Sequence, residues 1–145
     1  MKPIILLLVC MSFFSFFSCK SSYQPDAYKK EQIRFGSGGG FTGAITEYCL
    51  LASGHLFLKE HGDTTFTQIN KISKADAKAL FTEAVEKDIP TYKMKEPYNM
   101  YKFIHYMNED GINELVWGVD DTSKNGGGEI AGFHLKLMQL INPVE

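Results

Sequence analysis

The sequence predicts an α+β fold in which two helices pack on one face of a single antiparallel sheet. Four short segments with alternating apolar and polar residues, separated by tight turns, fill residues 31–69. Two further alternating segments flank an Asp-Gly turn at residues 110–111, and helical apolar spacing follows residues 73 and 129. A meander of strands, then a helix, then a hairpin and then a helix is an order that favours an α+β architecture.

The first 18 residues predict a lipoprotein signal peptide that is separate from the fold. Residues 4–17 are apolar except for two serines, and Lys2 supplies a positive start. This run is short for a membrane span of about 20 residues and has the layout of a secretory leader. Ser18 is small and precedes Cys19, so residues 16–19 resemble a bacterial lipobox, in which the cysteine takes palmitate-type acyl chains. An uncleaved anchor helix is the alternative, and both would hold the chain at a membrane.

Residues 19–30 are expected to form the lipidated cysteine and a flexible tether, since residues 20–26 contain serines, a proline and no aliphatic side chain. The leader and the Cys-Lys-Ser sequence resemble lipoproteins of the Bacteroidetes group, which implies a bacterial cell envelope protein anchored in the outer membrane. Of the three cysteines, Cys10 would leave with the leader and Cys19 would be acylated. Cys49 then has no partner for an internal disulfide, so the core alone must hold residues 31–145 together as one domain.

Four strands are predicted before the first helix. Their alternation and the turns between them indicate an antiparallel meander over residues 31–35, 43–51, 54–59 and 64–69. The second strand is predicted to be central because apolar residues occupy both of its faces, with Cys49 on one and Leu50 on the other.

A helix is predicted to begin at Ser73, which is a good N-cap and forms a capping-box pair with Asp76. Pro90 is expected to end this helix. Its apolar stripe, predicted to lie on the sheet, contains Ala77, Leu80, Phe81, Ala84 and Val85.

A polar connection over residues 91–99 precedes a predicted hairpin of residues 100–108 and 113–119. Leu115, Trp117 and Val119 are expected to point inward, with Trp117 in the core. A loop over residues 120–128 then leads to a closing helix over residues 129–141. The apolar face of that helix contains Ile130, Phe133, Leu137, Leu140 and Ile141.

A glycine-rich segment between the first two strands is the main candidate for function. Residues 35–43 hold five of the 13 glycines, and residues 38–43 match the pattern G-x-G-x-x-G. A dinucleotide site needs a helix after this loop, and Walker and kinase loops need further motifs that the sequence lacks. We therefore predict either a structural turn with Phe41 in the core or a protein-contact loop. The candidate binding loop comprises Gly38, Gly39, Gly40, Phe41, Thr42 and Gly43.

The other polar residues indicate no catalytic set, no metal site and no cofactor. Cys49 lies in the middle of a predicted strand, which favours a small buried residue over a nucleophile. Asp120, Asp121 and Asn125 lack the spacing of a calcium loop. A net charge of −2 without a basic stripe argues against nucleic-acid binding. The histidines lack zinc-ligand spacing and are expected to be ordinary surface residues: His55, His61, His105 and His134.

Three features together resemble the emfourin family. They are the glycine segment at residues 38–43, the helix around Leu80 and Phe81, and the Pro-led aromatic strand at residues 97–104. Emfourins carry a Gly-Gly-Phe-x-Gly segment after the first strand, and their characterised type inhibits thermolysin-like metalloproteases. The resemblance covers residues 31–141 and implies the same fold, with protease inhibition as an expectation.

The leading functional hypothesis is a membrane-anchored lipoprotein that binds an envelope or secreted protein and is not an enzyme. It would face the periplasm or the cell surface. One alternative is an inhibitor of a thermolysin-like metalloprotease. Others are a small-ligand carrier or enzyme that uses a cleft between sheet and helices, and a structural envelope protein.

Overall fold

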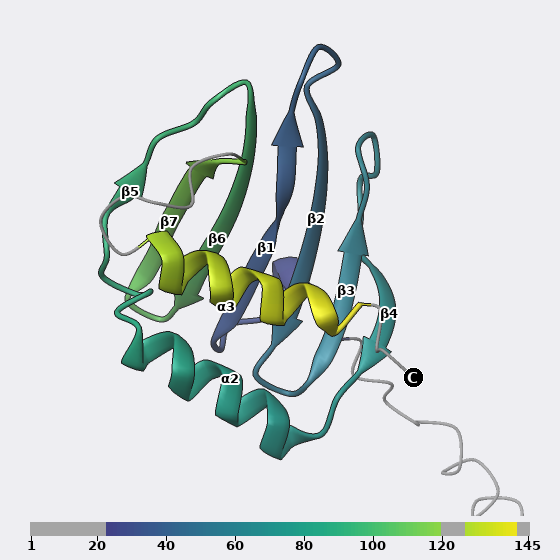
Figure 1. The fold of residues 1–145 in the computed structure, drawn as a ribbon. Helices are drawn as coiled ribbons and strands as arrows, with labels where there is room; N and C mark the ends of the chain where they lie inside the picture. The colour runs from purple at the N-terminus through teal and green to yellow at the C-terminus, as the bar shows by residue number, and fades with distance from the viewer. Residues whose placement is uncertain (1–22, 120–126, 142–145) are drawn as a thin grey trace, which may run out of the picture.

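The computed structural model describes residues 23–119 and 127–141. One seven-stranded sheet organises this part of the chain, and two helices lie across it in Figure 1. The α+β fold predicted from the sequence is confirmed. The strands lie in the order β4-β3-β2-β1-β6-β7-β5. Their bounds are β1 Gln32–Gly39, β2 Ala44–Leu51, β3 His55–Lys59, β4 Thr67–Lys71, β5 Met94–Lys95, β6 Met100–Asn108 and β7 Gly111–Gly118.

The sheet is mixed, so the prediction of a purely antiparallel sheet is wrong at one edge. β5 pairs in parallel with β7, with Met94 opposite Leu115 and Lys95 opposite Val116. The other neighbouring strands that the structure describes pair antiparallel. The sequence predicted a polar connection here because a strand of two residues is too short to show an alternating pattern.

β1 continues through the glycines at which the first strand was predicted to end. Gly36, Gly38 and Gly39 pair with β2 on one side and with β6 on the other. Isolated glycines weaken a strand, which is why the alternation indicated an earlier end. Backbone pairing with a strand on each side holds these residues in the sheet, although glycine has no side chain to pack. β4 also begins later than predicted, at Thr67, whereas β6 has its predicted bounds.

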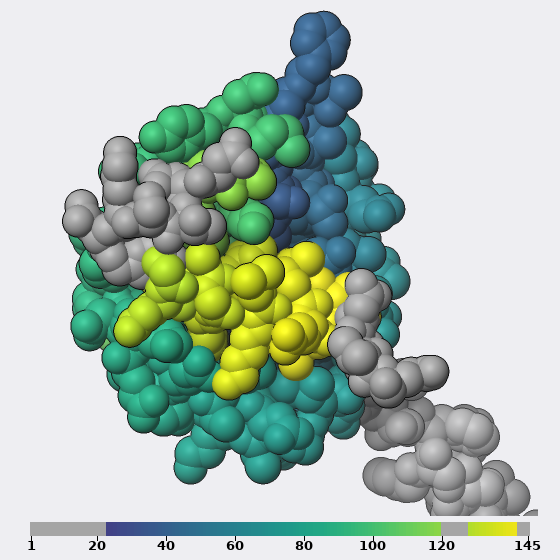
Figure 2. All heavy atoms as spheres, in the orientation of Figure 1, coloured from purple at the N-terminus to yellow at the C-terminus, as the bar shows by residue number. Residues whose placement is uncertain are grey.

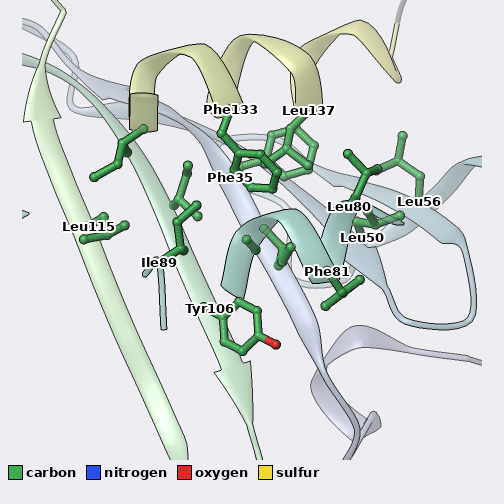
Figure 3. Packing of buried hydrophobic residues seen from close by; sticks show 14 of the residues in the cluster. Phe35, Leu50, Leu56, Leu80, Phe81, Ile89, Tyr106, Leu115, Phe133 and Leu137 are labelled. Atoms are coloured by element: carbon green, nitrogen blue, oxygen red, sulfur yellow. The ribbon is translucent and has the colours of Figure 1, made fainter. Parts of the chain in front are cut away.

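The helices α2 Lys74–Glu86 and α3 Gly127–Gln139 cover the same face of the sheet, as predicted (Figure 1). Figure 3 shows Phe133 and Leu137 of α3 and Leu80 and Phe81 of α2 around Phe35 of β1. Trp117 is in this core, as predicted. The buried cluster contains Ile33, Phe35, Leu50, Leu56, Leu80, Phe81, Ala84, Ile89, Ile104, Tyr106, Leu115, Trp117, Ile130, Phe133 and Leu137.

The predicted start of α2 is confirmed. Ser73 is its N-cap, and the Ser73 Oγ accepts a hydrogen bond from the Asp76 amide at 3.0 Å. The same hydroxyl donates to the Asp76 carboxylate at 2.6 Å. This cap satisfies one of the amides that the first helical turn leaves without a helical partner.

α2 ends before Pro90, for a reason that the sequence did not indicate. Asp88 has a left-handed backbone with φ 56°, and its amide donates to the Val85 carbonyl. The amide of Ile89 donates to the Ala84 carbonyl, which completes a Schellman motif. This turn places Ile89 in the core, whereas Val85, predicted in the apolar stripe, faces solvent.

The N-terminal segment packs on the other face of the sheet. Pro25–Ala27 forms the short 3-10 helix η2, which lies behind β1 and β2 in Figure 1. Gln32 Nε2 donates to the carbonyls of Pro25 and Tyr28 at 3.1 and 3.2 Å. This packing differs from the extended spacer expected through residue 26. A second apolar cluster lies there, formed by Cys49, Leu51, Phe57 and Phe66 with Tyr28 against it.

His134 is buried, which corrects the expectation of a surface histidine. Only 3% of it is exposed, and Trp117 and Phe35 pack around its ring. Its Nε2 lies 3.0 Å from the Gly36 carbonyl oxygen and donates to it, while Nδ1 has no hydrogen-bond partner among the described residues. Burial lowers the pKa of His134 to about 4, because a proton on Nδ1 would be desolvated.

Acid should therefore destabilise the fold through His134. The unfolded chain takes up a proton near pH 6.5 and the folded chain only near pH 4, so stability falls as the pH falls through this window. The loss from this group approaches about 3 kcal/mol at pH 4. We expect His134→Phe to be less stable than the natural chain at pH 7 and to lose less stability down to pH 4. Urea unfolding at several pH values measures this, and parallel losses in the two chains would contradict it.

Candidate functional site

The hairpin between β1 and β2 carries the predicted binding loop and projects beyond the rest of the sheet (Figures 1 and 2). Gly38 and Gly39 belong to β1, so only residues 40–43 form the turn. The Gly43 amide donates to the Gly40 carbonyl at 3.1 Å, which closes the turn. Phe41 at its tip is fully exposed. Of the two alternatives that the sequence left open, the one with Phe41 in the core is therefore wrong.

The glycines of β1 make room for aromatic rings from β6. Gly36 is the register partner of Phe103, and Gly38 is the partner of Tyr101. A Cβ at Gly36 would collide with the Thr46 carbonyl and would lie 3.1 Å from the Phe103 ring, and a Cβ at Gly38 would lie 2.7 Å from the Tyr101 hydroxyl. Both rings thus lie over the strand where side chains are missing. Such glycine–aromatic pairs recover packing that a glycine in a strand loses.

Gly39 combines a close backbone contact with a left-handed backbone conformation. Its φ is +100°, and a Cβ there would collide with the Asn99 carbonyl. The same carbonyl accepts a hydrogen bond from the Gly40 amide at 2.6 Å. The base of the hairpin is therefore held by the segment that precedes β6, and this contact fixes the direction in which Phe41 projects.

A groove of about 360 Å³ lies on the face of the sheet opposite the helices. The buried core cluster lies between the sheet and the helices, where one alternative from the sequence would place a ligand cleft. We call this groove the open-face groove. Its lining combines the apolar residues Ile45, Pro97, Tyr101, Phe103 and Val116 with the polar residues Glu47, Lys95 and His105.

Aromatic rings form the floor of the open-face groove. The ring centres of Tyr101 and Phe103 are 6.4 Å apart, and those of Phe103 and His105 are 4.8 Å apart. Burial lowers the pKa of His105, so its imidazole is neutral at pH 7. A neutral imidazole both donates and accepts hydrogen bonds, which suits a polar ligand group on an apolar floor.

The charged side chains of the groove are each paired with a residue outside its lining. Glu47 lies 3.5 Å from Arg34, and Arg34 is also 2.9 Å from Asp26. Lys95 lies 3.3 Å from Glu114, and both of these side chains are exposed. Exposed ion pairs contribute little stability, so a ligand can compete for Lys95 at small cost. Glu47 and Arg34 are largely buried, and Arg34 divides its charge between Glu47 and Asp26.

The remaining residues weighed in the sequence form no second site in the part of the chain that the structure describes. Cys49 is buried as predicted, and burial raises the pKa of its thiol to about 12, so it is not a nucleophile. His55 bonds Ser53 and stacks on Tyr23. Across residues 23–119 and 127–141 no three His, Cys, Asp or Glu side chains are grouped to hold a metal ion. The candidates Cys19, Asp120, Asp121 and Asn125 lie outside the described residues.

Sequence reasoning missed the open-face groove because its residues come from four strands and a connection. One signal was present, since Tyr101, Phe103 and His105 alternate along one predicted strand. Only the register shows that the strand beside them carries glycines, which opens the face above it.

Comparison with known proteins adds no functional evidence. No protein-family model and no curated protein sequence matches the chain. The emfourin resemblance therefore stays an expectation, and a function for this chain has to be argued from the geometry of its surface.

The two glycines that bound the hairpin should respond differently to alanine. Gly39→Ala meets a backbone carbonyl and a positive φ, and should cost about 3 kcal/mol or more. Gly43→Ala has a positive φ but open space, so the left-handed backbone alone should cost about 1 kcal/mol. Urea unfolding measures both values. Equal costs would show that the contact with residue 99 does not hold the hairpin.

Proposed function

We propose that the chain is a lipid-anchored envelope protein that binds a macromolecule through the β1–β2 hairpin. The carrying observation is Phe41, a fully exposed phenyl ring at the tip of a hairpin whose base is hydrogen-bonded to Asn99. An exposed aromatic ring on a preformed loop offers apolar area at a reduced ordering cost, because the backbone of the loop is already fixed. Aromatic anchors of this kind dominate the binding energy of protein interfaces.

Other apolar side chains lie at the same end of the sheet. Met100 is half-exposed and packs beside Gly40, and Tyr98 covers Gly118 with more than half of its own surface exposed. Ile45 at the start of β2 is also exposed. Exposed apolar side chains gathered at one end of a sheet are typical of an interaction site. Phe41 would therefore supply the central aromatic contact, and the neighbouring side chains would supply the apolar surface around it.

A lipid at Cys19 would place this end away from the membrane. Tyr23 stacks on His55, with ring centres 4.6 Å apart, and Cys19 is four residues earlier, within about 14 Å along an extended chain. β2 runs from the hairpin to the turn before His55, a distance of about 27 Å. Within the described residues, no helix has the length and apolar character to cross a membrane. The anchor and the hairpin would thus occupy opposite ends of the sheet.

A specific form of this proposal is inhibition of a thermolysin-like metalloprotease. The emfourin resemblance implies it, and the projecting hairpin favours it, because a loop carried by a rigid sheet can enter a cleft. The interaction with any envelope or secreted protein would use the same hairpin.

The proposed anchor predicts the mass of the mature amino terminus. We expect chain purified from membranes to begin at Cys19, carrying two or three acyl chains. Cys19→Ser should release the chain from the membrane fraction. Mass spectrometry that finds an intact, unacylated leader on the membrane-bound chain would refute the anchor without affecting the hairpin.

The hairpin proposal predicts contact at residue 41. A photo-crosslinking phenylalanine analogue at position 41 should form an adduct in the cell envelope, whereas the analogue at exposed Val85 on α2 should not. Phe41→Ser should weaken the captured complex about tenfold or more. The melting temperature should stay unchanged, since the ring is fully exposed.

Inhibition of purified thermolysin tests the more specific proposal, that the chain is a metalloprotease inhibitor. Inhibition that Phe41→Ser abolishes and Val85→Ser preserves would establish the inhibitor. Capture that depends equally on both positions, or on neither, would refute the hairpin as the binding element.

A further inference from the structure

Five register-matched positions cross the open face in one row. Glu47 on β2 pairs with Gly36 on β1, Gly36 pairs with Phe103 on β6, and Phe103 pairs with Val116 on β7. Val116 pairs in turn with Lys95 on β5. Except for the glycine, all of these residues line the open-face groove. The row therefore presents a carboxylate, an apolar floor and an ammonium group in that order.

The two charges stand far apart. Four strand spacings of about 4.8 Å separate β2 from β5, so the backbones at Glu47 and Lys95 are about 19 Å apart. An extended peptide of five residues spans about 17 Å, and long charged side chains shorten the length that is needed. The groove volume of about 360 Å³ lies within the range of small-ligand sites.

The geometry points to a short extended peptide segment of a partner protein as the occupant, with apolar residues between a basic and an acidic residue. The basic residue would lie at Glu47, the apolar side chains over Phe103 and Val116, and the acidic residue at Lys95. This inference rests on the proposed protein-binding function and names the chemistry of the partner. The apolar floor supplies area, and the charges select the segment.

Nearby charges do not exclude either end of such a peptide. Arg34 beside Glu47 is shared with Asp26, and the register partner Lys59 has its Nζ 5.4 Å from the Phe66 ring centre. At the other end, Glu114 compensates Lys95 but is exposed and can turn into solvent. The proposal does not involve Phe41, which is absent from the groove lining.

Synthetic peptides test the proposal on the full chain as cells process it. Acetyl-Lys-Leu-Leu-Glu-amide should bind more tightly than acetyl-Gln-Leu-Leu-Gln-amide by about fivefold or more at low salt, measured by calorimetry. Titration by NMR should shift the signals of His105 and Ile45. Equal binding of the two peptides, or no binding at millimolar concentration, would overturn the proposal.

Double-mutant cycles test which charged residue of the groove contacts which charged residue of the peptide. In the natural chain, exchanging the peptide lysine for glutamine should weaken binding about threefold, and in Glu47→Gln the same exchange should have almost no effect. Lys95→Gln should remove the effect of exchanging the peptide glutamate, and this residue lies on an exposed edge strand where folding is not at risk. Glu83→Gln, on the helix face, is the matched control and should leave both effects intact. Additive losses in both cycles would overturn the assignment.

Two further measurements distinguish peptide binding in the groove from partner binding at the hairpin and from dimerisation through the groove. Phe41→Ser should bind the peptide normally, so crosslinking at residue 41 and peptide binding succeed or fail independently. Sedimentation should show a monomer in the absence of peptide. A dimer that Lys95→Gln disrupts would assign the groove to a second copy of the chain and overturn the peptide.

Discussion

The pairing of β1 with β6 is the constraint on which the rest of the structure depends. β1 is bonded along its length to β2 and to β6, so it lies at the centre of the sheet. On the helix face it contributes Ile33 and Phe35 to the core. On the other face its glycines leave space above the strand, and the rings of Phe103 and Tyr101 occupy part of this space. The same strand thus builds a filled side and a hollowed side because its side chains alternate.

One half of the sheet face opposite the helices is covered by the N-terminal segment, and this segment leaves the other half uncovered. Across β1, β2 and β3, the N-terminal segment covers the sheet, and Gln32 links the two through its hydrogen bonds to Pro25 and Tyr28. Gln32 also accepts from the Cys49 thiol at 3.3 Å, so this buried amide is satisfied on both of its ends. Near β6, β7 and β5, aromatic rings and charged side chains face outward instead. The groove lies on this part of the sheet, and Pro97 of the connection before β6 also lines it.

This division relates the proposed anchor, hairpin and groove to one another. The segment that would follow the lipid leads into residues 25–28, which pack on the sheet. The hairpin extends from the opposite end, and the groove begins at Ile45 at the base of the hairpin. A partner held at the tip would therefore reach the groove over a preformed surface, which limits the entropy lost on binding.

Much of the fold could be predicted from the sequence, because the signals concerned are local. The order of strands and helices, the Ser73 cap and the burial of Trp117 follow from apolar spacing and from turn and cap residues within a few positions. The glycine segment was also recognised as a candidate, although the side on which Phe41 lies was not decided. The leader and the acylated Cys19 rest on sequence pattern alone.

Tertiary structure alone decided the parallel edge strand β5, the burial of His134 and the open-face groove. Each results from partners distant in the chain: Lys95 meets Val116, His134 meets the Gly36 carbonyl, and Glu47 and Lys95 become the ends of one row. A register between strands is set by packing of the whole sheet, and a shift of one residue would turn every side chain to the other face. Local spacing reports which residues form a strand, but it carries no information about which residues stand beside them.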